Sequence, residues 1–283
     1  YDAFSSVYIW TLMNEYEYYP DGNWSYNPAA DLWAIRVGRY VKQIAPHGHP
    51  VAVHNGPRQP PFAERFRFAP GVIDLIMFQS WGTRGKEDAW LAAGIEDEIT
   101  SSMKGWRGSF ILAEYGYERN PELELKLPIH EHIDPEHTRR GAWRGTFSAI
   151  GIVHGWENTW GPWWIPEKDQ EGMKYLLILK KFFTEIVEFH RFRPFTEIID
   201  KPERYEYGKR PLCMASLDGD AFLIYLPVGE SFTVKISEPE RFRSFWFNPR
   251  TGESKKAAGT VQPGSISFDA PDYEDWVLVM EKR

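Results

Sequence analysis

Two glutamates, Glu15 and Glu114, each follow a short apolar segment that is typical of a buried strand. Residues 7–13 lead into Asn14 and Glu15, and residues 110–113 lead into Glu114. In parallel α/β proteins the carboxyl ends of the strands lie at one rim, where ligands bind. The sequence therefore predicts two carboxylates at one rim. Cleavage of a glycosidic bond requires such a pair, because one protonates the leaving oxygen and the other attacks the anomeric carbon or activates water.

Further polar and aromatic residues stand at the predicted ends of the other strands and could contact a sugar. The purely structural alternatives to a sugar contact are a simple hydrogen bond at the rim, a salt bridge, or core packing for a tryptophan. Glu17 lies close to Glu15 in sequence and would replace it after a slip in register. The candidate contacts are His54, Gln79, Trp81, Trp156 and Glu157.

The composition excludes several classes of function. The chain has 283 residues, of which 42% are hydrophobic and 26% charged, as in ordinary globular proteins. A net charge of −7 argues against a nucleic-acid partner, and no apolar run is long enough to span a membrane. The single cysteine, Cys213, excludes an internal disulfide. Histidine pairs such as His47 and His49 have the spacing of metal ligands but lack a third one, so the sequence indicates no metal and no cofactor.

The pattern up to about residue 190 alternates strands and helices. The Asp31 side chain can cap the first helix, and the last helix is apolar nearly all round, which predicts burial. Five such βα units predict a parallel sheet, either closed in a barrel or open and doubly wound. No Gly-rich phosphate loop follows a strand, which weighs against nucleotide binding. The predicted strands are 7–13, 51–53, 72–78, 110–113 and 151–154, and the helices are about 32–44, 87–104, 135–150 and 171–189.

From about residue 192 the pattern changes to short strands separated by turns. Residues 212–217 and 221–226 flank an Asp-Gly turn and predict a hairpin. Together with segments around 232–236, 243–247, 265–268 and 276–280, they predict a compact β-sandwich. The expected domains are 1–190 and 191–283, with the boundary between Phe189 and Arg193.

Asn14-Glu15 and Glu114-Tyr115-Gly116, three strands apart, resemble the motifs of the clan of retaining (β/α)8-barrel glycoside hydrolases. In that clan an Asn-Glu pair ends the fourth strand and a second Glu ends the seventh. The second domain, with residues 246–252 (WFNPRTG) and Asp275-Trp276-Val277-Leu278, narrows the resemblance to the apiosidase-like proteins. Their C-terminal module is named for collagen binding. The resemblance covers essentially the whole chain.

This resemblance implies a role for each rim residue. Glu15 would act as general acid and then as base, and Glu114 would be the nucleophile of a double displacement. Asn14 would bind the hydroxyl beside the reacting carbon, and Tyr115 could orient Glu114. Trp156 would form a floor for the sugar ring, and Glu157 would bind a hydroxyl.

The resemblance also implies that the chain is incomplete as a barrel. If Glu15 ends the fourth strand, the first domain is the C-terminal part of a (β/α)8 TIM barrel, about strands 4–8, followed by a small β-sandwich. We therefore expect an N-terminal half of the barrel, on a separate segment or chain, as a partner beside the carbohydrate substrate. Two alternatives remain open: a carbohydrate- or matrix-binding scaffold without catalysis, and a transglycosidase on the same site. The compartment is left open, with secreted or periplasmic slightly favoured over cytoplasmic.

Overall fold

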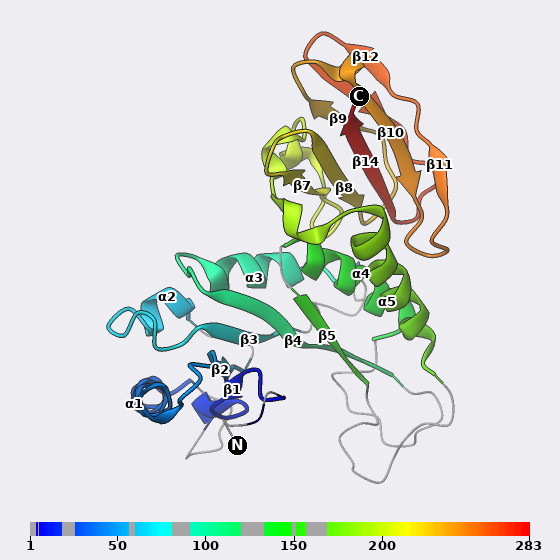
Figure 1. The fold of residues 1–283 in the computed structure, drawn as a ribbon. Helices are drawn as coiled ribbons and strands as arrows, with labels where there is room; N and C mark the ends of the chain where they lie inside the picture. Colours follow the sequence, from blue (N-terminus) through cyan, green and yellow to red (C-terminus); the bar gives the residue numbers. More distant parts are fainter. Residues whose placement is uncertain are drawn as a thin grey trace. The chain divides into compact units, whose positions relative to one another are not determined.

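A computed structural model gives the fold of the chain (Figure 1). It describes residues 4, 6–18, 26–56, 60–80, 91–119, 133–148, 151–156 and 169–283. The chain forms two compact units, and each is described by itself. The first unit comprises Tyr1–Trp81, Glu96–Tyr115 and Ile150–His154, and the second comprises Gly82–Ile95, Gly116–Ala149 and Gly155–Arg283.

A five-stranded sheet in the order β1-β2-β3-β4-β5 organises the first unit. The pairs β1–β2, β2–β3 and β3–β4 are all parallel, as the alternation of strands and helices predicted. The strands are β1 (Trp10–Thr11), β2 (Val51–His54), β3 (Leu75–Ser80), β4 (Ser109–Glu118) and β5 (Gly151–Trp156).

Helices connect these strands, with bounds that differ in detail from the sequence prediction. Helix α1 (Pro28–Ile44) begins earlier than expected, because the Asn27 side chain accepts a hydrogen bond of 2.9 Å from the Ala29 amide. The prediction that Asp31 caps this helix was wrong. Helix α3 (Ile95–Met103) begins later than predicted, and the short helix α2 (Phe62–Arg65) was not predicted.

Strand β4 corrects a second prediction. It does not end before Glu114 but continues through it to Glu118. Its pairing with β3 shifts register after Phe78, so that Phe78 is opposite Leu112 while Gln79 is opposite Glu114. This β-bulge leaves Ala113 without an opposite residue. Bulges re-aim the side chains that follow them, and here the next side chain is that of Glu114.

Two antiparallel sheets dominate the second unit. The six-stranded sheet has the order β11-β10-β14-β8-β7-β6, and the three-stranded sheet has the order β12-β13-β9. The predicted hairpin is confirmed, because β7 and β8 pair antiparallel. The strands are β6 (Phe192–Pro194), β7 (Leu212–Ser216), β8 (Ala221–Leu226), β9 (Phe232–Lys235), β10 (Phe242–Phe247), β11 (Ser254–Lys256), β12 (Thr260–Gln262), β13 (Ser265–Phe268) and β14 (Trp276–Lys282).

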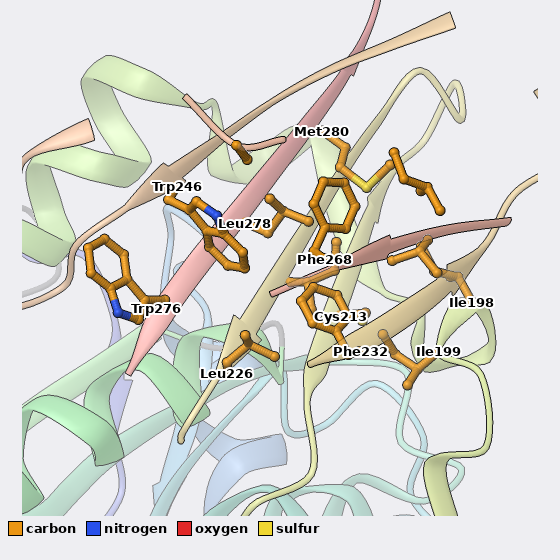
Figure 2. Close-up of a cluster of buried hydrophobic side chains, with 14 residues drawn as sticks. Ile198, Ile199, Cys213, Leu226, Phe232, Trp246, Phe268, Trp276, Leu278 and Met280 are labelled. Atoms are coloured by element: carbon orange, nitrogen blue, oxygen red, sulfur yellow. The ribbon is translucent and has the colours of Figure 1, made fainter. Parts of the chain in front are cut away.

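An aromatic and aliphatic core fills the space between these two sheets (Figure 2). Trp246, Phe232 and Phe268 lie at its centre, and their ring centroids are 5.8 to 6.3 Å apart. Their side chains alternate along the strands with outward-facing ones, as in other sandwiches. This cluster confirms that the segment beyond residue 192 folds around an apolar core.

Helices α4 (Pro135–Phe147) and α5 (Glu171–Lys181) belong to the same unit, followed by a π-helical turn, Phe182–Ile186. Trp143 of α4 stacks on Tyr225 of β8 and contacts Phe247 of β10. The prediction that the last helix is largely buried was wrong. Leu177 is 62% exposed, and the buried apolar side chains lie in the second half of the predicted segment, at Leu179, Phe182, Phe183 and Val187.

Three arginines of α4 are almost completely buried in this unit. Arg139 forms a buried ion pair with Asp275, with Nη2 and Oδ1 3.0 Å apart. Arg140 bonds Glu274, and Arg144 donates to the carbonyl of Leu91. The pKa of Arg139 is raised above its ordinary value, because the charge and hydrogen bonds of Asp275 outweigh the cost of burial. No described helix is long and apolar enough to cross a membrane.

Candidate active site

Glu15 lies at the turn that follows β1. Its backbone has φ +47°, a left-handed conformation that is uncommon for residues other than glycine. The amide of Gln79 donates a hydrogen bond of 2.8 Å to Glu15 Oε1. Strained backbone that the surroundings hold in place is concentrated at functional sites. Asn14 shares this turn and is exposed.

Gln79 joins this turn to the second glutamate. It is the register partner of Glu114 across the β3–β4 pair, through the bulge described above. The Gln79 side chain is 1% exposed, so burial and the bond to Glu15 fix its position. The sheet therefore brings Glu15, Gln79 and Glu114 to the same rim, which the strand-end reasoning had predicted.

His54, the last residue of β2, contacts the second carboxylate. Its Nε2 lies 3.7 Å from Glu114 Oε2. Burial lowers the pKa of His54 to about 4, so the imidazole is neutral near pH 7 and the contact is not an ion pair. Nδ1 of this ring is buried and has no hydrogen-bond partner among the described residues. A buried polar atom of this kind at a rim is suited to a ligand hydroxyl or a water.

A buried network fixes the segment after Glu15. Residues Tyr16–Tyr18 form a 3-10 turn, and Glu17 within it is 0% exposed. Glu17 Oε1 accepts hydrogen bonds from Asn55 Nδ2 at 2.6 Å and from Arg65 Nη1 at 3.2 Å. The carboxylate of Glu17 is thus fully occupied inside the protein. This geometry favours Glu15 over Glu17 as the reactive group.

Arg65 of α2 is the centre of this network. Its guanidinium bonds both Asp31, at 2.7 Å, and the hydroxyl of Tyr16, and Tyr26 donates to the same aspartate. The desolvation of Arg65 is outweighed by these partners, so its pKa is raised above its ordinary value. Burial raises the pKa of Tyr26 to about 12. Asp31 therefore has a role in the interior that differs from the predicted cap.

Sequence reasoning missed Arg65 and its partners. Arg65 lies in a stretch between two strands that is rich in proline and arginine, where no periodic pattern indicates a buried side. A signal was nevertheless available, because aromatic residues surround it on both sides in the sequence. Phe62 and Phe66 both contact its guanidinium.

The other predicted contacts have different placements. Tyr115 is 0% exposed, and its ring packs 5.6 Å from that of His154, so it offers no surface to a sugar. Trp156 ends β5 and is partly exposed. Trp81 and Glu157 lie outside the described residues. Within the part of the chain that is described, no three His, Cys, Asp or Glu residues cluster as metal ligands.

Comparisons with known proteins give the relatives of both parts of the chain. Residues 196–281 match the sequence family described as "Putative collagen-binding domain of a collagenase". No curated protein is detectably similar to the chain in sequence.

Solved structures resemble the chain over most of its length. A structure described as a glycoside hydrolase matches 90% of this chain and 69% of its own, with 17% identity and a TM-score of 0.64. A family 5 glycoside hydrolase from Bacteroides vulgatus matches 87% of this chain over 58% of its own length, with 17% identity and a TM-score of 0.65. A family 51 arabinofuranosidase from Xanthomonas axonopodis matches 98% of this chain over 66% of its own length, with 12% identity and a TM-score of 0.52. At these identities the likeness establishes that the chain shares its fold with a part of such enzymes.

Proposed function

We propose that the chain carries the catalytic pair of a retaining glycoside hydrolase, with Glu15 as acid and base and Glu114 as nucleophile. One observation carries this proposal: Gln79 is hydrogen-bonded to Glu15 and is the register partner of Glu114. A single buried residue thus lies beside two carboxylates from distant parts of the chain: it donates a hydrogen bond to one and is opposite the other in the sheet. The fold shared with glycoside hydrolases supports the same interpretation.

In the proposed mechanism the two carboxylates act from opposite sides of the glycosidic bond. Glu15 gives its proton to the leaving oxygen while the Glu114 carboxylate attacks the anomeric carbon, so that a glycosyl-enzyme ester forms as the bond to the leaving group breaks. Glu15, now ionised, takes a proton from water, and that water displaces Glu114. A retaining reaction of this kind requires a separation of about 5–5.5 Å between the carboxyl groups.

The neighbouring residues receive supporting roles. Asn14, exposed beside Glu15, would bind the hydroxyl next to the reacting carbon. Gln79 and neutral His54 would hold the two carboxylates in position. Trp156, the last residue of β5, remains a proposed sugar contact, as do Trp81 and Glu157, which lie outside the described residues.

We also propose that a further segment or chain completes the barrel beside β1. Strand β1 pairs with β2, and no other described strand pairs with it. Near this edge Tyr8 is 79% exposed, and on α1 Leu32 and Tyr40 are 70% and 59% exposed. Open strand edges and exposed apolar side chains are typical of surfaces that another part of a protein covers. The chain also spans only 58% to 69% of the first two enzyme structures it matches.

Covalent trapping tests the catalytic proposal. The protein, with its completing barrel segment, would be treated with a panel of 2-deoxy-2-fluoro aryl glycosides of pentoses and hexoses and then digested for mass spectrometry. We expect one of these reagents to label Glu114, and we expect Glu114→Gln to remove the label. In Glu15→Ala, added azide should restore turnover of activated aryl glycosides, because azide needs no general base.

Two results would overturn the proposal. Labelling of a residue other than Glu114 would reject the nucleophile, and failure of every reagent to react while the protein binds saccharides would favour the non-catalytic scaffold. The matched control is Glu17→Gln, which removes a buried carboxylate of the Arg65 network. It should lower stability without abolishing labelling of the folded fraction.

A further inference from the structure

A groove on the six-stranded sheet of the second unit has the chemistry of a ligand site. It has a volume of about 490 Å³ and lies over β10, β11 and the end of β14, which are neighbours in the sheet (Figure 1). Its lining includes Arg243, Phe245, Ser254, Lys256 and Glu281. All of these residues belong to one unit, and the groove involves none of the residues of the candidate active site.

The register of the strands places these five side chains on one face. Lys256 is opposite Phe245, and Arg243 is opposite Glu281. Residues that are directly opposite in an antiparallel pair share a face, and so do residues two apart along a strand. Two cations therefore flank one partly exposed aromatic ring. The same face is apolar farther along β10, where Phe247 packs on Phe182 with ring centroids 4.7 Å apart.

The charges in the groove are unbalanced. Arg243 is held by Glu281, with Nη2 and Oε2 2.7 Å apart. Lys256 is exposed and has no acidic partner within the described part of the chain. Lys255 is different, because its side chain is on the other face and its Nζ lies over the ring of Trp276, 4.6 Å from the centroid. The groove thus has a surplus of positive charge in a chain whose net charge is −7.

We propose that this groove binds an anionic saccharide, with a uronate ring on Phe245 and its carboxylate between Lys256 and Arg243. An aromatic face attracts the C–H groups of a pyranose, and ammonium and guanidinium groups form charge-assisted hydrogen bonds to a carboxylate. Ser254 adds a hydroxyl for the sugar. The β-sandwich would then hold the protein on an acidic polysaccharide, independently of whether the other unit is catalytic.

Affinity electrophoresis of the full chain tests this proposal, with polygalacturonate in the gel as the probe. We expect polygalacturonate to retard the protein, and we expect Lys256→Ala to weaken binding by about tenfold, the effect of one charge-assisted hydrogen bond. Phe245→Leu should weaken it as well, because the aromatic face is lost while the volume is nearly kept. The matched control is Lys235→Ala, which removes the same charge from β9 in the other sheet.

Three further gels separate the possible ligands. Dextran, a neutral glucan, should not retard the protein, and poly-L-glutamate, which has carboxylates without sugar rings, should bind more weakly than polygalacturonate. Equal retardation by poly-L-glutamate would show that the groove recognises carboxylates without a sugar ring and would reject a saccharide ligand. Capture by collagen without retardation by polygalacturonate would reject an anionic polysaccharide as the ligand. Equal effects of Lys256→Ala and Lys235→Ala would reject the groove. None of these outcomes depends on labelling of Glu114, so the two proposals fail independently.

Discussion

Nε2 of His54 lies 3.7 Å from Oε2 of Glu114, yet the histidine is neutral. A carboxylate at this distance favours the imidazolium, but burial disfavours it more strongly and holds the pKa of His54 at about 4. His54 can therefore place one N–H toward Glu114 without neutralising its charge. For a proposed nucleophile this is the useful arrangement, because the attacking carboxylate must stay ionised.

The depressed pKa of His54 predicts a loss of stability in acid. At pH 7 the imidazole is neutral in the folded and the unfolded chain. Below the ordinary value of about 6.5 the unfolded chain takes up a proton that the folded chain takes up only near pH 4. Stability should therefore fall as the pH falls through this window, by about 2–3 kcal/mol at pH 4.5 from this residue.

Urea unfolding at pH 7 and pH 4.5 measures this effect. His54→Asn, which cannot titrate, should lose less stability than the wild type between the two values. His190→Asn, which changes an exposed histidine, is the control and should keep the wild-type dependence. If His54→Asn follows the wild type at both pH values, the histidine is not buried in its neutral form.

Gln79→Leu should lower activity without unfolding the protein. The substitution removes the 2.8 Å bond that fixes Glu15, while leucine fills much of the same space. We expect kcat to fall about 10- to 100-fold, the equivalent of one hydrogen bond to a charged group, with a smaller change in KM. Steady-state kinetics on the 2-hydroxy parent of the aryl glycoside that labels the wild type would measure this, with the exposed Gln43→Leu on α1 as control. An unchanged kcat would show that Glu15 does not need Gln79.

Arg65→Met should be among the most destabilising substitutions in the first unit. It leaves Glu17 and Asp31 buried without their cation. Removing one partner of a buried ion pair typically costs about 3–5 kcal/mol. Arg67→Met, two residues away and exposed, should cost less than about 1 kcal/mol. Equal effects of the two variants on urea unfolding would contradict the proposed network.

Asp275→Ala tests the link between α4 and the six-stranded sheet. Asp275 is 0% exposed and accepts from Arg139, so its loss leaves a buried guanidinium with Glu136, 3.8 Å away, as its remaining acidic contact. We expect a loss of about 3–5 kcal/mol in the free energy of unfolding of the second unit. Asp220→Ala breaks an exposed pair with Lys282 and should cost at most about 1 kcal/mol. A small effect of Asp275→Ala would mean that the aromatic contacts of α4 and the hydrogen bonds of Arg140 hold it to the sheet without Asp275.

The sequence by itself determined the parallel sheet of the first unit, the hairpin of the second unit and the rim position of Glu15 and Glu114. These are local signals: apolar runs that end in polar residues, an alternating pattern and an Asp-Gly turn. Element ends were less well predicted. Asn27 rather than Asp31 caps α1, and β4 continues through Glu114, because capping and strand pairing depend on neighbours that a local pattern does not contain.

Only the tertiary structure showed that Glu17 is a buried structural carboxylate, which leaves Glu15 as the candidate for catalysis. Glu15 and Glu17 are equally polar in the sequence, but Arg65, far along the chain, buries Glu17 in its network. The bulge that places Glu114 beside Gln79 also depends on the register between two strands. The same holds for the groove on the second unit, where antiparallel pairing puts Arg243, Phe245 and Lys256 on one face. In each case the deciding interaction joins residues on different strands or helices, and only folding brings them into contact.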